Sequence, residues 1–275
     1  MVASRRWRVA AAVLLAAVAA GCGGPPAAVP PARSSAIPAV PSTSNSTPAG
    51  TDRAVPVYYV AETGSGPRLY REFHRIVTAD AASDAVREMF EPATDRDYRT
   101  GWPAGTSLRE PVTSANGVIT VDLTGAGTVD LGGGAALPAQ QLVFTVQGAL
   151  QSEDPVRLLV DGRPATPEPI RRGDAYALRS LVQIDAPADG ATVPSAFTVT
   201  GEAAVFEATV HWEVLRDGAV LRTGFTSAAE GMRFSAFSFP LNLGPGTYTV
   251  RVLEDDPSGG EGRAPLTDDR VVTVR

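Results

Sequence analysis

Apolar and polar residues follow regular periods only after the first fifth of the chain. Residues 55–61 and 68–77 are rich in Val, Tyr, Phe and Ile. A turn sequence at 64–67 separates them, and this pattern predicts two strands. Asp80 is a suitable N-terminal cap for a helix that follows. The apolar residues that would share one face of this helix are Val86, Met89 and Phe90.

The same region continues with a predicted hairpin, a helix and a further strand. Residues 108–113 and 118–123 flank Asn116-Gly117, a dipeptide that favours a tight two-residue hairpin turn. After a glycine-rich turn, the apolar residues with a helical period are Leu142, Val143, Val146 and Leu150. A last strand is predicted at 156–160. Because strands and helices mix without a regular βαβ repeat, residues 55–163 are expected to form one α+β domain.

The C-terminal part of the chain has the period of two that is typical of strands. Val210, Trp212 and Val214, for example, would face one side of a sheet. The seven strand candidates are 181–186, 197–203, 208–216, 219–226, 233–243, 246–254 and 269–274. Seven short strands separated by turn residues predict an all-β immunoglobulin-like sandwich at 181–275.

The N-terminus reads as a bacterial export signal. Arg5, Arg6 and Arg8 precede an uncharged run at 9–20, which is too short to span a bilayer as a helix. Small residues then lead to Cys22, the only cysteine of the chain, in an arrangement that resembles a lipobox. We therefore expect residues 1–21 to be a lipoprotein signal peptide. Cys22 would be the lipidation site, and its acyl chains (palmitate among them) would anchor the protein. The sequence does not distinguish the general secretory route from the twin-arginine route.

Two segments lack any apolar period. Residues 22–54 are rich in Pro, Ala, Ser and Thr, so they are expected to be a disordered tether behind the lipidated cysteine. Residues 164–180 carry several prolines and arginines and are expected to be a linker between the two domains. The formal net charge is −6, and the first 21 residues hold three arginines and no acid, so the remainder carries about −9. This charge argues against nucleic-acid binding.

The two predicted domains resemble a known bacterial pair. Residues 55–163 resemble a GerMN domain, which is found in sporulation and spore-germination proteins. The stretches that carry this resemblance are 57–60, 108–112, 117–123, 141–145 and 156–162. Residues 181–275 resemble the Ig-like domain that accompanies GerMN in many such proteins, most specifically at 199–210. The resemblance implies an envelope lipoprotein that acts through protein–protein contact, because the GerMN fold resembles ring-building modules of secretion-like assemblies.

The sequence offers few residues for catalysis or metal binding. The only histidines, His74 and His211, lie in different predicted domains and within strands, where a solvent-facing position is expected. A nucleophile and an oriented base are therefore not predicted to meet. With two histidines and a lipidated cysteine, a zinc site is not expected either. We predict no catalytic residue, no metal site and no cofactor.

Three other features have a structural and a functional interpretation. The run 132–134 of three glycines could bind an anion before a helix, but a structural turn is favoured, since no Gly-Lys-Ser/Thr sequence follows. The acidic segment 254–261 could bind calcium, but its spacing does not match an EF-hand, so a solvated loop is expected. Trp102 could be an exposed contact residue or could fill a small core, and the core position is favoured.

These patterns predict a non-catalytic lipoprotein at the outer face of the cell membrane. It would bind or assemble with another envelope protein, in sporulation, germination or envelope maintenance. The alternative is a module that binds peptidoglycan or another wall glycan, which exposed aromatic residues beside a groove would favour.

Overall fold

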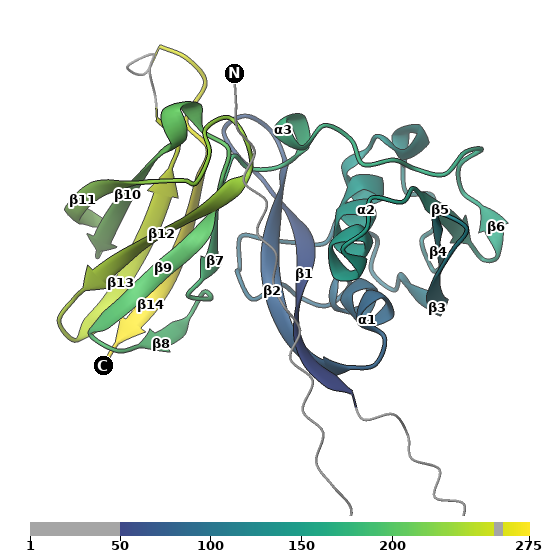
Figure 1. Ribbon diagram of the computed structural model, residues 1–275, viewed down its shortest axis with the longest axis horizontal. Coiled ribbons are helices and arrows are strands. Elements are labelled where there is room, and N and C mark those ends of the chain that lie inside the picture. The colour runs from purple at the N-terminus through teal and green to yellow at the C-terminus, as the bar shows by residue number, and fades with distance from the viewer. Residues whose placement is uncertain (1–49, 256–260) are drawn as a thin grey trace, which may run out of the picture. The chain divides into compact units, whose positions relative to one another are not determined.

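The first folded region begins with a long antiparallel hairpin. In the computed structural model, which describes residues 50–255 and 261–275 (Figure 1), β1 (Thr51–Ala61) pairs with β2 (Arg68–Thr78) along their full length. The strands and turn predicted here are confirmed, but β1 begins at Thr51. The end of the expected tether is therefore part of a strand, because it pairs with residues 75–78 of β2. The predicted signal peptide, Cys22 and most of the tether lie outside the described residues.

A short helix and a second hairpin follow, as the sequence predicts. Helix α1 (Ala81–Glu88) is capped by Asp80, whose carboxylate accepts a hydrogen bond from the Ser83 backbone N–H at 3.1 Å. Strands β3 (Ser107–Ala115) and β4 (Val118–Thr124) are joined at Asn116 and Gly117, with φ of 53° and 73°. Two consecutive positive φ values are what a type I′ turn requires, and the Asn-Gly pair adopts them at little cost.

Replacing Asp80 with alanine removes the side-chain acceptor at the start of α1. We expect the free energy of unfolding to fall by about 1 kcal/mol. Urea denaturation of the two proteins measures this difference. Asp52→Ala is the matched control, because Asp52 lies in an exposed ion pair with Arg75, and we expect it to change stability by less than about 0.5 kcal/mol. Equal losses in the two variants would contradict a capping role.

One parallel crossover lies within the first domain. The chain passes from β4 through α2 (Leu137–Leu150) to β5 (Val156–Val160), which pairs in parallel with β4. A two-residue strand, β6 (Arg163–Pro164), completes a four-stranded sheet in the order β3-β4-β5-β6. The sequence predicts α2 and β5 but not β6.

The buried residues of this domain show how its helices and its two sheets are layered. Helices α1 and α2 lie between the β1–β2 hairpin and the four-stranded sheet (Figure 1). Buried residues of both helices contact apolar residues of β1 on one side and of β4 and β5 on the other, for example Val57, Leu142 and Val121. Trp102 belongs to this core and is 4% exposed, which confirms the favoured core position.

The predicted linker is an ordered part of the fold. Ile170 is buried and exchanges two backbone hydrogen bonds with Val156, at 2.8 and 2.7 Å. A single helical turn, α3 (Ala175–Leu178), follows. Arg179 then bridges to Leu69 of β2. These contacts hold the segment that links the two domains against the first of them.

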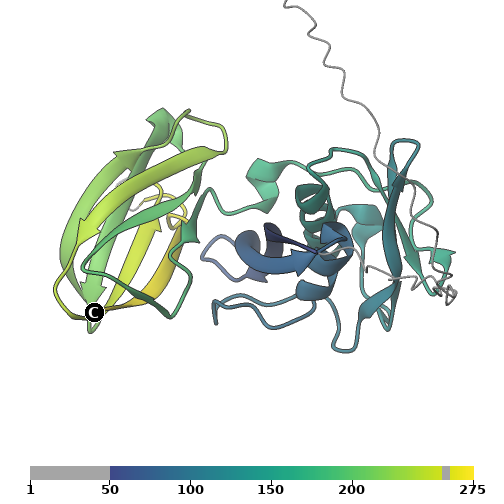
Figure 2. The same cartoon turned by 60° about the horizontal axis from the view of Figure 1, so that its bottom comes forward.

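The C-terminal domain is a sandwich of two sheets, which face each other in Figure 2. One sheet has the order β11-β10-β13-β14-β8 and the other the order β12-β9-β7. The strands are β7 (Val182–Ala186), β8 (Ala191–Val193), β9 (Ala196–Ala203), β10 (Thr209–Arg216), β11 (Ala219–Ser227), β12 (Ser235–Asn242), β13 (Gly246–Leu253) and β14 (Thr267–Val274). All seven predicted strands are confirmed, and β8 is an addition. The fold is therefore an α+β domain followed by an immunoglobulin-like sandwich.

Candidate functional site

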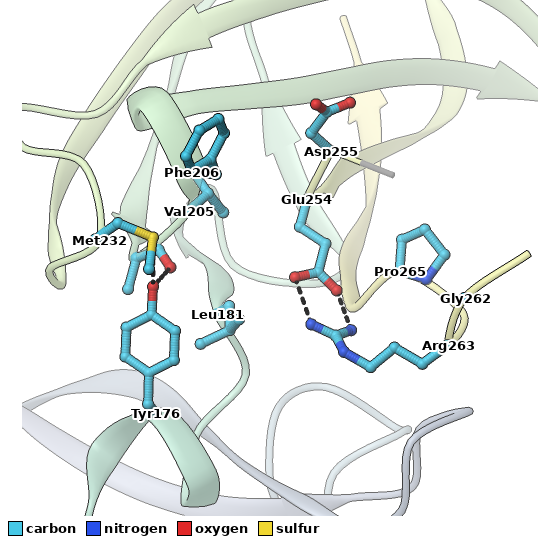
Figure 3. Close-up of a pocket in the computed structure, with 11 residues that line it drawn as sticks. Tyr176, Leu181, Val205, Phe206, Met232, Glu254, Asp255, Gly262, Arg263 and Pro265 are labelled. Atoms are coloured by element: carbon cyan, nitrogen blue, oxygen red, sulfur yellow. Dashed lines mark hydrogen bonds and ion pairs between the residues drawn. The ribbon is translucent and has the colours of Figure 1, made fainter. Parts of the chain in front are cut away.

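A cavity of about 310 Å³ opens between α3 and one end of the sandwich, and we call it the Tyr176 pocket. Figure 3 shows that its side chains come from α3, from the segments around residues 205 and 232, and from the chain on either side of the 256–260 gap. The lining residues are Tyr176, Leu181, Ala204, Val205, Phe206, Met232, Glu254, Asp255, Gly262, Arg263 and Pro265. Most of this lining is apolar, and the charged groups lie along one wall.

Hydrogen bonds hold both the backbone and the hydroxyl of Tyr176. The carboxylate of Asp174 accepts a hydrogen bond from the Tyr176 backbone N–H at 3.0 Å and so starts α3. The phenol oxygen donates to the carbonyl of Ala204 at 2.5 Å and lies 3.4 Å from the sulfur of Met232 (Figure 3). Burial, and then the nearby Glu254, raise the pKa of Tyr176. Its hydroxyl is therefore a fixed hydrogen-bond donor rather than a base.

The rim of the pocket next to the Tyr176 hydroxyl presents apolar side chains from a strained backbone. Phe206 is 62% exposed and Met232 is 56% exposed. Glu207, Ala208 and Met232 have φ values of 50°, 57° and 58°, a region that residues with a Cβ adopt only at a cost. The Met232 backbone N–H donates to the carbonyl of Val205 at 2.9 Å and holds the two rim segments together. Exposed apolar side chains on a backbone fixed in this way are typical of a binding surface.

The charged wall consists of a buried carboxylate and its partner. Glu254 is 7% exposed, accepts a hydrogen bond from the Leu266 backbone N–H at 2.6 Å, and forms a two-point ion pair with Arg263 (Figure 3). The sequence predicts a solvated acidic loop from residue 254, and for Glu254 this is wrong. Residues 256–260 of that loop lie outside the described residues.

The arrangement of groups in the Tyr176 pocket suits the binding of an apolar group. Among the described residues that line it there is no serine, cysteine, histidine or lysine, so these residues offer no nucleophile paired with a base. Glu254 is held in its ion pair with Arg263. An apolar cavity with a few fixed polar groups fits a protruding side chain or another small apolar group.

His74 lies in a polar contact that the sequence does not predict. Its two ring nitrogens lie 2.8 Å from a carboxylate oxygen of Glu88 and 3.0 Å from one of Glu72, and the side chain is half-buried. Burial lowers the pKa of His74, but the hydrogen bonds to Glu72 and Glu88 outweigh it, so the pKa is raised. The expected solvent-facing position is therefore wrong for His74. The carboxylate of Glu72 also accepts backbone hydrogen bonds at residues 94 and 95, which makes this contact structural.

The remaining sequence candidates do not line the pocket. His211 is 39% exposed on β10, as expected, and lies 3.4 Å from Asp255. The glycines at 132–134 form a short 3₁₀ turn (η1, Gly132–Gly134) before α2. Among the described residues, no group of three or more His, Cys, Asp or Glu side chains is arranged to hold a metal ion. Within the same part of the chain, no helix has the length and hydropathy needed to cross a membrane.

A buried charged cluster joins the two domains. Arg270 of β14 donates hydrogen bonds to Asp95 and to Asp268, and both of its terminal nitrogens lie 3.0 Å from the hydroxyl of Tyr98. Asp95 and Tyr98 belong to the first domain, whereas Asp268 and Arg270 belong to the sandwich. Burial raises the pKa of Asp95 to about 7, although Arg270 opposes this and the nearby Asp268 adds to it. The cluster explains how the two domains are held in contact.

Comparison with known families assigns both domains. Residues 56–166 match the family described as "Sporulation and spore germination". Residues 181–261 match the family described as "Immunoglobulin-like domain of bacterial spore germination". A comparison with curated proteins gives no match.

Solved structures show only distant likeness. The tandem GerMN domains of the sporulation protein GerM from Bacillus subtilis are 19% identical, with 48% of this chain and 48% of that chain covered and a TM-score of 0.36. A lytic polysaccharide monooxygenase from Jonesia denitrificans is 17% identical, with 32% and 60% covered and a TM-score of 0.24. Murine CRIg is 12% identical, with 34% and 96% covered and a TM-score of 0.21. Similarity at this level supports no conclusion about activity.

The resemblance found in the sequence is thus confirmed for both regions. The matches place sporulation and germination families on residues that fold as the α+β domain and as the sandwich. Residues 56–166 are therefore similar to the sporulation and spore germination family, and residues 181–261 to the immunoglobulin-like domain of bacterial spore germination.

Proposed function

We propose that this protein is a non-catalytic lipoprotein of the cell envelope that acts by binding another protein through the Tyr176 pocket. The observation that carries the proposal is the exposed pair Phe206 and Met232 at the rim of an apolar cavity. A partner would insert an apolar side chain into the cavity and cover the two rim residues, which is how anchor residues contribute most of the affinity of an interface. The two domain families support a role in sporulation or germination.

The proposed location rests on the N-terminal sequence. Lipidation of Cys22 would anchor the chain at the outer face of the cell membrane, and the residues before Thr51 would separate the folded domains from the lipid surface. A partner of this protein would then be another protein exposed on the same side of the membrane.

Crosslinking in living cells tests the proposed interface. A photo-crosslinking residue at Glu207, next to Phe206, would capture the partner, which mass spectrometry would identify. We expect Phe206→Ser to reduce the captured partner by about tenfold or more, because loss of a buried aromatic anchor costs about 2 kcal/mol or more. Phe225→Ser is the matched control, since Phe225 is 72% exposed on β11, away from the pocket.

Two further results decide between partner classes. Equal capture by the Phe206→Ser and Phe225→Ser proteins would contradict a protein interface at the Tyr176 pocket. Co-sedimentation with purified peptidoglycan, lost in Phe206→Ser, would instead assign the exposed ring to a wall glycan. Cys22→Ala tests the anchor separately, because a membrane partner should then be lost while the pocket remains intact.

A further inference from the structure

A second cavity, of about 350 Å³, is lined by four arginines. They are Arg53 of β1, Arg71 of β2, and Arg172 and Arg179 of the ordered segment before the sandwich. Tyr58 lines the same space. We call this cavity the arginine pocket, and it has no residue in common with the Tyr176 pocket.

Two of the four arginines are neutralised by carboxylates. Arg71 forms a two-point pair with Asp185, at 2.9 and 2.8 Å, and a further ion pair with Glu202 at 2.8 Å. Arg179 shares Glu202, at 2.7 Å. Four guanidinium groups thus meet two carboxylates, and two positive charges are left over in a chain whose net charge is negative.

The other two arginines have no acidic partner among the described residues. The side chain of Arg172 lies over the ring of Phe144 and donates its Nε hydrogen to Gln147 at 2.8 Å. Burial is the largest cause that lowers the pKa of Arg172, and the nearby Arg179 adds to it, whereas Tyr58, Glu153 and Glu202 oppose it. The C-terminal end of α2 contributes only about half a negative charge there. Arg53 is exposed at the mouth of the pocket.

Hydrogen-bond donors in the pocket are also unused. The side chain of Arg179 is only 6% exposed, and its Nε is buried without an acceptor among the described residues. The Tyr58 hydroxyl makes no hydrogen bond to any described residue, and its ring lies 5.4 Å from the Arg179 guanidinium. A buried donor without an acceptor is costly, which applies to the Nε of Arg179; the Tyr58 hydroxyl is not among the buried unpaired atoms, and an acceptor that enters the pocket would pair with it.

We propose that the arginine pocket binds a phosphate group. A phosphate group carries one negative charge as a diester and up to two as a monoester, so it complements the two uncompensated positive charges, and planar guanidinium groups form paired hydrogen bonds with phosphate oxygens. The cavity is larger than phosphate itself, so the group belongs to a larger ligand or to the headgroup of an anionic phospholipid. This inference stands on residues separate from the proposed protein interface, and either can fail without the other.

Isothermal titration of the full chain carrying Cys22→Ala with inorganic phosphate tests the proposal, with chloride at equal ionic strength as the blank. We expect saturable binding, weakened about tenfold by Arg172→Gln and also weakened by Arg53→Gln. Arg53 is exposed, so its variant keeps the test free of folding defects. Arg163→Gln is the matched control, because Arg163 is exposed on β6 and lies outside the pocket.

Vesicle binding distinguishes the source of the phosphate. Binding to vesicles of phosphatidylglycerol in phosphatidylcholine, lost in both pocket variants, would assign a lipid headgroup. Saturable binding of inorganic phosphate without vesicle binding would assign a free phosphate ligand. The proposal is overturned if inorganic phosphate does not bind at concentrations below about 10 mM and the vesicles do not bind either. It is also overturned if the pocket variants bind the probes as the Arg163→Gln protein does.

Discussion

Replacing Arg270 with methionine is expected to lower the free energy of unfolding by about 3–5 kcal/mol. Arg270 is 3% exposed, and its guanidinium is the cation shared by the carboxylates of Asp95 and Asp268. Methionine keeps much of the side-chain volume but leaves both carboxylates buried without a counter-charge. The hydroxyl of Tyr98 and the carbonyl of Ile184 also lose a donor. Urea denaturation at pH 7.5 measures the loss.

The matched control is Arg233→Met. Arg233 is 78% exposed and lies 3.5 Å from Glu230, an ion pair that solvent screens. We expect this variant to differ from the parent by less than about 0.5 kcal/mol. Because the Arg270 cluster connects the two domains, its loss should also separate their unfolding into two transitions. A single transition with a loss no larger than the control's would show that the cluster contributes little to the domain contact.

The strands of the sandwich could be predicted because their signal is local. The alternation at β10 and β13 depends on neighbouring residues only, and the structure confirms it. Strand β8 has three residues, Ala191–Val193, which is too short for an alternating pattern. It exists because it pairs in parallel with the end of β14, about 80 residues away. No local pattern carries that information.

The packing of the segment between the domains also could not be predicted from local patterns. Its prolines and arginines are typical of a solvated linker, yet Ile170 pairs with β5 and Arg179 is buried between β2 and the sandwich. The charged side chain of Arg179 is held by Glu202, a residue of β9. A charge that is buried with a distant partner looks in the sequence like any surface charge.

The Tyr176 pocket could not be predicted for a related reason. Its lining comes from segments that are up to about 90 residues apart, and no two of its main side chains form a motif. The signal that remained in the sequence was weak. Phe206 lies at an irregular step between two predicted strands, where an apolar residue has no core to enter. Expectations about Cys22, the tether and the envelope partner stay predictions.

Stability should fall as the pH rises from about 4 to about 8, in part because of Asp95. Its pKa is raised to about 7 in the folded protein, against an ordinary value near 3.9. Folding therefore favours the protonated carboxyl group. This contribution is complete below about pH 4 and is lost as the pH rises through about 7, with a total on the order of 2–4 kcal/mol. The like-charged Asp268 faces Asp95 across Arg270 and adds to the effect.

Asp95→Asn isolates the contribution of this carboxyl group. Asparagine cannot ionise, and its Oδ1 can still accept the hydrogen bond that the Asp97 backbone N–H donates to Asp95 at 2.9 Å. The pKa of His74 is also raised, so its contribution to stability is lost over part of the same pH range. This loss is the same in both proteins, and it cancels when the stability of one is subtracted from that of the other at each pH. We expect the free energy of unfolding of the variant to rise steadily relative to that of the parent from pH 5 to pH 8, as measured by urea denaturation at each pH. Parallel curves would mean that Asp95 is ionised throughout and that Arg270 outweighs the cost of burial.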